Sequence, residues 1–104
     1  MPDKITLVVH FRMDESAKQE FTAKLHDIFT HIVKEETFVE ASLVQDMRDQ
    51  GSILIYEVWN ESPESFMKIQ MSRPYRAEYE KMIVDLRIER IPAWYSTIAD
   101  WKKG

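Results

Sequence analysis

Hydrophobic residues change their spacing several times along this chain, and the order of those changes most constrains its fold. Over Ile5–Met13 apolar side chains occupy alternate positions, which predicts a strand with one strongly apolar face. A capping box over Ser16–Gln19 and apolar residues spaced by three and four over Phe21–Ile32 predict a helix. Phe38–Gln45 and Ser52–Trp59 each contain β-branched or aromatic residues and predict two strands of a β-hairpin, because a polar linker ending in glycine joins them.

The second helical region is predicted to be split by proline. Ser62 before Pro63 is a strong helix start, and Pro74 interrupts that helix and begins another. The predicted buried stripe of this second helix is Tyr75, Tyr79, Met82 and Leu86. The segment from Arg87 to about Ile98 is strand-like, and Pro92 within it predicts an edge strand or a bulge.

This order of elements predicts a single domain over residues 1–104 with a ferredoxin-like α+β fold, βαββαβ. Its four-stranded antiparallel sheet would carry both helices on one face. The strand Ser52–Trp59 is apolar on both sides, so Leu54, Tyr56 and Val58 would face away from the helices. We therefore expect a homodimer in which two sheets pack face to face; the alternative is that these are ordinary scattered surface hydrophobes.

Composition excludes several classes of function. The chain has 104 residues, no Cys and only two Gly, so thiolate chemistry and glycine-rich phosphate loops are not expected. A net charge of -4 argues against nucleic acid as a partner. No segment is long and apolar enough to predict a membrane span or a signal peptide, which favours a cytoplasmic location.

Several motifs resemble the antibiotic biosynthesis monooxygenase family. They are Tyr56-Glu57-Val58-Trp59, then Phe66, Gln70, Ser72-Arg73-Pro74-Tyr75 and Tyr79, and the resemblance covers nearly the whole chain. It implies a dimeric α+β barrel with a mainly apolar pocket between sheet and helices. It also implies oxygenation of phenolic, quinol or anthrone-like substrates without metal, flavin or haem, so no cofactor is expected.

The chain also departs from the family pattern. Gln70 stands where the family usually has a helix histidine, Ala41 where an aromatic is frequent, and Tyr75 follows the proline in place of histidine. Haem-degrading relatives use an asparagine on the first strand, where this chain has Val9, and a helix histidine that 74–86 lacks. The resemblance therefore does not extend to haem binding.

Trp59 and Glu57 are the predicted catalytic residues. Trp59 would supply a flat wall and an indole N–H aimed at a substrate oxygen, or would instead be a core tryptophan at the end of the sheet. Glu57, on the same side of the strand, would orient Trp59 or act as a base if burial raised its pKa. The alternative that we favour for Glu57 is a structural ion pair with Arg12 or Arg87.

Five further residues are predicted to bind substrate: Gln70, Tyr75, Tyr79, Phe11 and Val9. Gln70 would donate to a carbonyl or accept from a phenol, or would occupy a helix edge. The two tyrosines lie one turn apart and would direct both hydroxyls into one slot, or would belong to the core. If Phe11 and Val9 face the helices, His10 points away from them toward the dimer interface.

No metal site is predicted, because His26 and His31 do not share a helix face. The predicted function is a cofactor-independent monooxygenase that acts on a small quinol- or anthrone-like aromatic with molecular oxygen. Two alternatives stay open: a non-catalytic small-molecule-binding dimer, and an isomerase of a small oxygenated metabolite.

Overall fold

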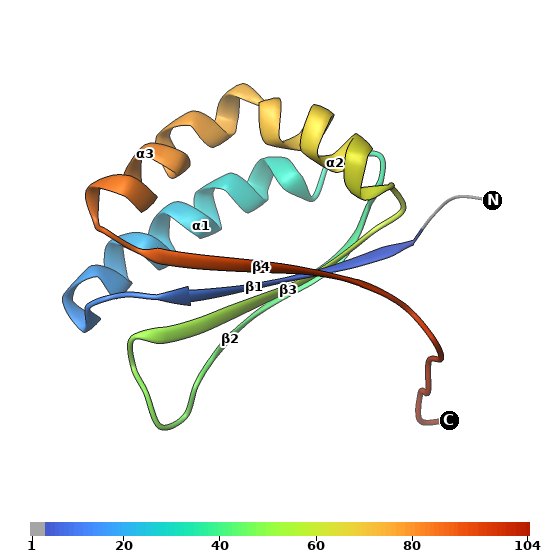
Figure 1. Ribbon diagram of the computed structural model, residues 1–104, viewed down its shortest axis with the longest axis horizontal. Coiled ribbons are helices and arrows are strands. Elements are labelled where there is room, and N and C mark those ends of the chain that lie inside the picture. Colours follow the sequence, from blue (N-terminus) through green and yellow to red (C-terminus); the bar gives the residue numbers. More distant parts are fainter. Residues whose placement is uncertain (1–3) are drawn as a thin grey trace.

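The computed structural model describes residues 4–104 and shows one sheet covered on one face by helices (Figure 1). The strands are β1 (Ile5–Arg12), β2 (Phe38–Gln45), β3 (Ser52–Trp59) and β4 (Glu89–Ser96). The α-helices are α1 (Lys18–Ile32), α2 (Pro63–Ile69) and α3 (Ala77–Asp85). Short 3-10 turns precede α1 (Glu15–Ala17) and join α2 to α3 (Gln70–Ser72 and Pro74–Arg76). The predicted domain begins in residues 1–3, which lie outside the described part.

The strand order is β2-β3-β1-β4, and all neighbouring strands are antiparallel. The central strand β1 pairs with β3 from Ile5 opposite Trp59 to Arg12 opposite Ser52. On its other side β1 pairs with β4, which forms the sheet edge where Pro92 needs no ladder donor. The predicted ferredoxin-like α+β fold, with its four-stranded antiparallel sheet, is confirmed.

The core lies between the sheet and the helices, as the alternation in β1 and β3 predicts. Its buried members include Ile5, Leu7, Val9 and Phe11 of β1, Phe21, Leu25, Ile28 and Ile32 of α1, and Tyr79, Met82 and Ile83 of α3. Aromatic rings connect the layers, and the Phe11 and Phe21 ring centroids are 4.8 Å apart. Burial of this apolar surface is the main force that holds the helices on the sheet.

Of the two predicted helix starts, the one at Ser62 is confirmed and the one at Ser16 is wrong. Ser62 caps α2 as expected, since its hydroxyl accepts a hydrogen bond from the Ser65 amide at 3.1 Å. The capping box at Ser16 is wrong: Asp14 is the cap, and its carboxylate accepts from the Ser16 amide at 3.1 Å. A 3-10 turn therefore comes first, and α1 begins at Lys18 with no side-chain cap.

The β2–β3 hairpin crosses close to the end of β1. A Cβ added to Gly51 would lie 2.2 Å from the Met13 carbonyl oxygen, so no larger residue fits without a backbone shift. The Gly51 carbonyl in turn accepts a hydrogen bond from the Met13 amide at 2.9 Å. Glycine is thus fixed by close packing at this turn.

The outer face of the sheet, opposite the helices, is partly apolar. Tyr56 is 37% exposed and Leu54 is half-buried. Val58, the third residue predicted to face away from the helices, is only 1% exposed, so it adds nothing to the exposed apolar surface of this face. Val58 lies on an inner strand, where Thr6 and Glu40 are its partners on either side. Other exposed apolar residues of this face and of the segment after β4 are Val44, Ile91, Tyr95, Ile98 and Trp101.

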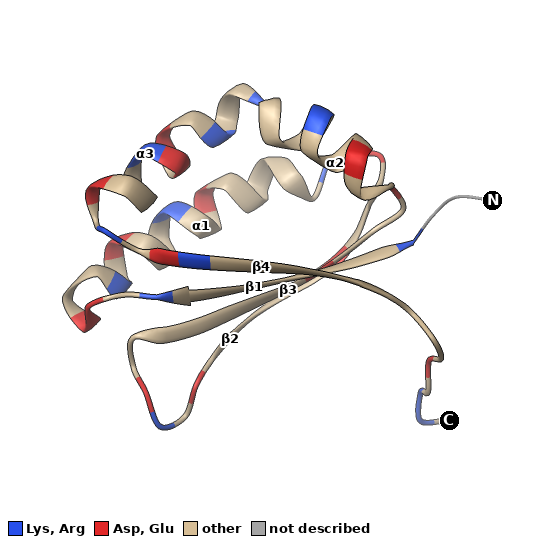
Figure 2. Cartoon of the chain, viewed as in Figure 1, with Lys and Arg blue, Asp and Glu red and all other residues tan. Residues whose placement is uncertain are grey.

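Charged residues gather on the helices and turns. Figure 2 shows both signs side by side on α1 and α3 and few charges along the middle of the strands. Within residues 4–104 no helix has the length and apolarity that crossing a membrane requires.

Candidate functional site

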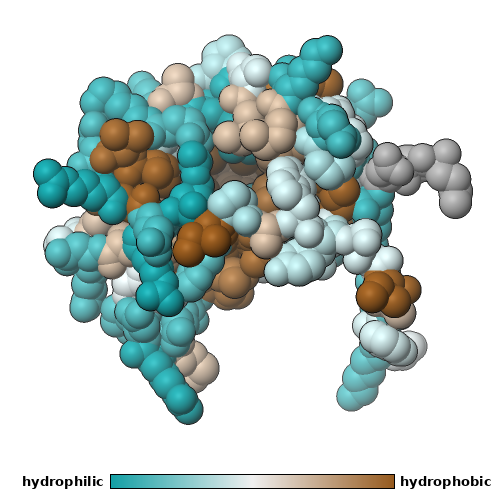
Figure 3. Space-filling model, viewed as in Figure 1, coloured by the Kyte–Doolittle hydropathy of each residue, from teal (hydrophilic) through white to brown (hydrophobic). Residues whose placement is uncertain are grey.

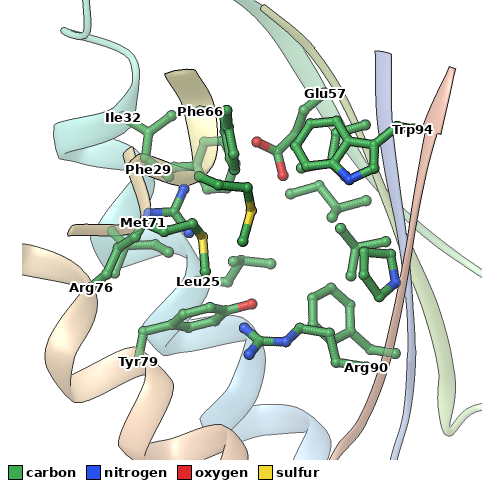
Figure 4. Close-up of a pocket in the computed structure, with 17 residues that line it drawn as sticks. Leu25, Phe29, Ile32, Glu57, Phe66, Met71, Arg76, Tyr79, Arg90 and Trp94 are labelled. Atoms are coloured by element: carbon green, nitrogen blue, oxygen red, sulfur yellow. The ribbon is translucent and has the colours of Figure 1, made fainter. Parts of the chain in front are cut away.

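A cavity of about 230 Å³ lies between the inner face of the sheet and the helices (Figure 4). Apolar residues dominate its wall: Leu7, Val9, Phe11, Leu25, Ile28, Phe29, Ile32, Ile55, Phe66, Met67, Met71, Pro92 and Trp94. Figure 3 shows hydrophobic residues between the helical layer and the sheet edge formed by β4. Four polar side chains complete the lining: Glu57, Arg76, Tyr79 and Arg90.

Glu57 extends from β3 into the cavity and is only 6% exposed (Figure 4). Its Oε1 accepts a hydrogen bond from the Trp59 indole N–H at 2.9 Å. Burial raises the pKa of Glu57, while the Trp59 bond and the positive charge of Arg76 oppose that rise. The carboxyl therefore has the properties of a proton acceptor that works nearer neutral pH than an ordinary glutamate.

The favoured ion pair of Glu57 with Arg12 or Arg87 is wrong. Arg12 approaches Glu89 at 4.0 Å at the end of the sheet. Arg87 is exposed and occupies the tight turn before β4, with a φ of 54°. The other expectation for Glu57, that it orients Trp59, is met by the hydrogen bond between them.

Arg76 enters the cavity from the step between α2 and α3 and is 7% exposed. Its guanidinium carbon lies 5.6 Å from the centroid of the Phe66 ring, a cation–π contact. Its buried Nε has no hydrogen-bond partner. None of the salt bridges within residues 4–104 involves Arg76.

Tyr79 and Arg90 converge at the opposite end of the cavity (Figure 4). Tyr79 is 3% exposed, and burial raises the pKa of its phenol, which keeps the hydroxyl neutral. Arg90 is held by Glu80 through two hydrogen bonds, Nη1 to Oε2 and Nη2 to Oε1, both 2.7 Å. The positive charge of Arg90 is therefore already neutralised by a carboxylate.

Four of the predicted site residues line the cavity: Val9, Phe11, Glu57 and Tyr79. Trp59 does not. It is fully buried, with its ring 5.3 Å from that of Phe38 and 5.2 Å from that of Phe66. Its N–H is bonded to Glu57, so the expectation that the N–H points at a substrate oxygen is not met.

Tyr75 lies outside the cavity, because the turn at Pro74 directs it toward α1. Its hydroxyl donates to Glu35 at 2.8 Å, and its ring stacks on His31 at a centroid distance of 4.9 Å. Burial and the nearby Glu35 raise the pKa of Tyr75 to about 12. The expectation that Tyr75 and Tyr79 share one slot is therefore not met.

Gln70 is buried but also outside the cavity wall. Its side-chain amide donates to Glu61 at 3.1 Å, and Glu61 also accepts from Thr37 at 2.6 Å and Ser65 at 2.5 Å. Burial acts to raise the pKa of Glu61, but these three hydrogen bonds outweigh it and lower the pKa. Glu61 thus fastens the chain before β2 to α2 and to the turn that follows it.

Among the cavity residues that sequence reasoning missed, Arg76, Arg90 and Trp94 contribute most to the chemistry of the site. Arg90, Pro92 and Trp94 alternate along β4, so strand parity could have placed them together on the inner face. Arg76 precedes Tyr79 by three residues and shares its helix side. Composition gives no sign that this arginine is buried, because arginine is ordinarily exposed.

No group of three or more His, Asp or Glu residues in the described chain converges closely enough to hold a metal ion. The cavity therefore offers one buried carboxyl, one buried guanidinium without a carboxylate partner and one phenol within apolar walls. This arrangement can exclude water, accept a proton and stabilise an oxyanion.

Solved structures with the same fold span nearly the whole chain. SnoaB, a cofactor-independent oxygenase from Streptomyces nogalater, is 14% identical over 97% of this chain and 99% of its own, with a TM-score of 0.79. A conserved protein from Methanosarcina mazei is 17% identical over 91% and 93% of the two chains, with a TM-score of 0.79. A candidate antibiotic biosynthesis monooxygenase from Deinococcus radiodurans is 13% identical over 96% and 98%, with a TM-score of 0.80.

At these identities the structures establish the shared fold. No curated protein matches this chain in sequence. The family model described as antibiotic biosynthesis monooxygenase matches residues 4–81, which is most of the chain. The chain therefore belongs to the antibiotic biosynthesis monooxygenase family.

Proposed function

We propose that this protein is a cofactor-independent monooxygenase that acts on a small quinol-like aromatic. The observation that carries the proposal is the buried carboxyl of Glu57 facing an apolar cavity of about 230 Å³. Membership of the monooxygenase family and the fold shared with a cofactor-independent oxygenase support the same reaction class.

The size of the cavity limits the substrate. A dry apolar cavity of roughly 150 Å³ holds one benzene molecule. A cavity of about 230 Å³ therefore suits one substituted ring or two fused rings, and a three-ring anthrone would need a wider space. Phe66 and Trp94, whose ring centroids are 5.2 Å apart, provide flat aromatic surface in the wall.

Glu57 is the proposed proton acceptor. A quinol reacts faster with oxygen once it has lost a proton, because the resulting anion is the better electron donor. In the proposed step the phenolic O–H bond breaks, the proton moves to the Glu57 carboxylate, and the electron pair stays on the substrate oxygen. The Trp59 N–H holds the carboxyl in place, so Trp59 acts as a positioning residue.

The oxygen step balances without a separate reductant. One oxygen atom of O₂ replaces a ring hydrogen as a hydroxyl group, and the other leaves as water. Hydroxylation takes two electrons from the substrate, and oxidation of the quinol to a quinone supplies the two others that O₂ requires. The protein contributes binding, proton acceptance and exclusion of water.

We also propose that the protein works as a homodimer through the outer face of the sheet. Ile91 is 49% exposed and Tyr95 is 55% exposed on this face, and Trp101 beyond β4 is 88% exposed. Covering them would remove apolar surface from water. Sedimentation of the protein at micromolar concentration should give twice the monomer mass; a monomer at all accessible concentrations would contradict this.

Oxygen consumption tests the catalytic proposal. One- and two-ring hydroquinones should consume one O₂ per hydroxyquinone formed, and their dimethyl ethers, which have no ionisable hydroxyl, should consume none. Tight binding of the hydroquinones without enzyme-dependent oxygen uptake would contradict the proposal and favour a binding protein. A product formed equally well without oxygen would indicate an isomerase.

A further inference from the structure

Arg76 has no role in the proton and oxygen steps proposed above, yet its charge is buried in the cavity wall. It is 7% exposed, and its Nε is buried without a hydrogen-bond partner. A buried cation is costly unless an opposite charge or hydrogen bonds compensate it. The face of the Phe66 ring, 5.6 Å from the guanidinium carbon, favours this charge through a cation–π contact.

The other arginines near the cavity differ from Arg76. Arg90 is paired with Glu80 through two bonds of 2.7 Å. Arg73, on the same step between α2 and α3, also has a buried Nε without a partner, but its Nη2 donates to Glu35 at 2.9 Å. Both have carboxylate partners, whereas Arg76 forms no salt bridge within residues 4–104 and lines the cavity.

Glu57 lines the same cavity as Arg76, and the positive charge of Arg76 acts to lower the pKa of Glu57, so an ionised Glu57 compensates part of that charge. That compensation disappears when Glu57 takes up a proton. The cavity then contains one buried positive charge, and a negative charge on the ligand would restore the balance. Tyr79 stays a neutral phenol and Arg90 is already paired with Glu80, so neither offers an unpaired charge to the ligand.

We propose that Arg76 makes this cavity an anion-binding site that takes a one- or two-ring aromatic as its phenolate, with the oxyanion on the guanidinium. The inference rests on the proposed function's site and deepens it by naming the charge state in which the ligand binds. A flat guanidinium beside apolar walls suits an aromatic ring that carries a single oxyanion. Glu57 holds the proton that the ligand releases, so the ligand and Glu57 together gain no net charge.

A ligand pair tests this without catalysis. 4-Nitrophenol and 4-nitrotoluene have nearly the same size, but only the first can ionise, and its phenolate has a distinct long-wavelength absorption band. We expect the wild-type protein to bind 4-nitrophenol as the phenolate, roughly ten- to hundredfold more tightly than 4-nitrotoluene, as measured by calorimetry and absorbance. Equal affinities, binding as the neutral phenol, or no binding of either ligand would overturn the inference.

Two matched variants test whether Arg76 supplies the charge that favours the phenolate. Arg76→Gln should abolish the preference for 4-nitrophenolate and leave the 4-nitrotoluene affinity within about twofold. Arg73→Gln, which removes the same charge from a neighbouring position outside the cavity, should leave the preference intact. An equal loss in both variants would overturn the assignment. If Arg76→Gln does not fold, Arg76→Lys keeps the charge and should retain a preference that falls with added salt; loss of all preference in that variant would overturn it too.

A third variant separates this inference from the proposed activity. Glu57→Gln removes the proton acceptor but leaves the Arg76 charge, so phenolate binding should persist while oxygen uptake falls. Phenolate selection in a protein that oxidises no quinol would contradict the proposed function and leave the anion site standing. Oxygen uptake in a protein that shows no preference for the phenolate would contradict the anion site and leave the proposed function standing.

Discussion

Glu57 and Glu61 are four residues apart, and both are 6% exposed, yet their environments shift their pKa values in opposite directions. Glu61 accepts hydrogen bonds from three side chains, those of Thr37, Ser65 and Gln70. Glu57 accepts one, from Trp59, and otherwise faces a mainly apolar cavity that also contains Arg76. Residue exposure alone therefore does not decide the charge of a carboxyl, because hydrogen-bond donors and nearby charges act against burial.

This difference separates a structural acid from a candidate catalytic one. A carboxylate satisfied by three donors is stable when ionised and has little tendency to take up a proton. A carboxyl with one donor and open space beside it can exchange a proton with a ligand. The family position that the sequence singled out, Gln70, belongs to the structural group, because its amide is a donor to Glu61.

The largest expected effect is on catalysis at Glu57. Glu57→Gln keeps an acceptor for the Trp59 N–H but cannot take a proton, so the rate of quinol-dependent oxygen uptake should fall by about 10²- to 10⁴-fold. Glu61→Gln should retain most of the rate per folded molecule. Similar losses in the two variants would remove the functional distinction between these residues.

The next largest effect is on stability, where Glu61→Gln should lose more than Glu57→Gln. Glu61→Gln places an amide among three donors and should lower the free energy of unfolding by about 1–3 kcal/mol, as measured by urea denaturation. Glu57→Gln removes a buried charge that has one hydrogen bond and should leave stability at neutral pH unchanged or higher. A larger loss in Glu57→Gln than in Glu61→Gln would contradict the comparison.

Trp59→Phe tests whether the hydrogen bond from the indole N–H controls the pKa of Glu57. The variant loses the hydrogen bond that lowers the pKa of Glu57, so the acidic limb of the oxygen-uptake profile should move to higher pH. Loss of part of a fully buried ring should also cost about 1–2 kcal/mol of stability. An unchanged pH profile in a folded variant would mean that the indole does not control Glu57.

The smallest expected effect is on how the folding stability of the two glutamine variants depends on pH. The raised pKa of Glu57 means that its favourable contribution is present in acid and is lost as pH rises above 4.5 through the native value. The lowered pKa of Glu61 means that its contribution is present above 4.5 and is lost as pH falls through the native value. Relative to wild type, Glu57→Gln should therefore gain stability as pH rises from 4 to 8. The stability that Glu61→Gln loses relative to wild type should be smallest at acid pH and should grow as pH rises. Parallel curves for the two variants would contradict the opposite shifts.

Much of the fold could be predicted from local patterns. The bounds of β2 and β3 agree with their predicted ranges, because segments rich in β-branched and aromatic residues end at a polar turn that only glycine can close against Met13. The start of α1 could not be predicted as well, since Asp14 and Ser16 are both good caps and the structure uses the first. Local sequence does not show which of two adjacent caps the backbone will choose.

The site was less predictable than the fold. Strand parity correctly placed Val9, Phe11 and Glu57 on the helix-facing side of the sheet, where they line the cavity. Parity also placed Trp59 on that side, but it cannot show that Trp59 lies beyond the cavity, packed against Phe66. The turn at Pro74, which sends Tyr75 to α1 and Arg76 into the cavity, depends on tertiary packing that no spacing rule describes.

Glu57 and Trp59 project from one strand with a single residue between them, and that arrangement has a mechanical consequence. A central strand is the most rigid part of a sheet, whereas α2 and the turn that follows it are short segments of the covering layer. If that layer lifts to admit a ligand, the room available changes while the carboxyl and its indole stay aligned. Substrate entry therefore leaves the hydrogen bond between Glu57 and Trp59 in place, whereas the burial and the Arg76 charge that also set the pKa of Glu57 come from the covering layer and change when it moves.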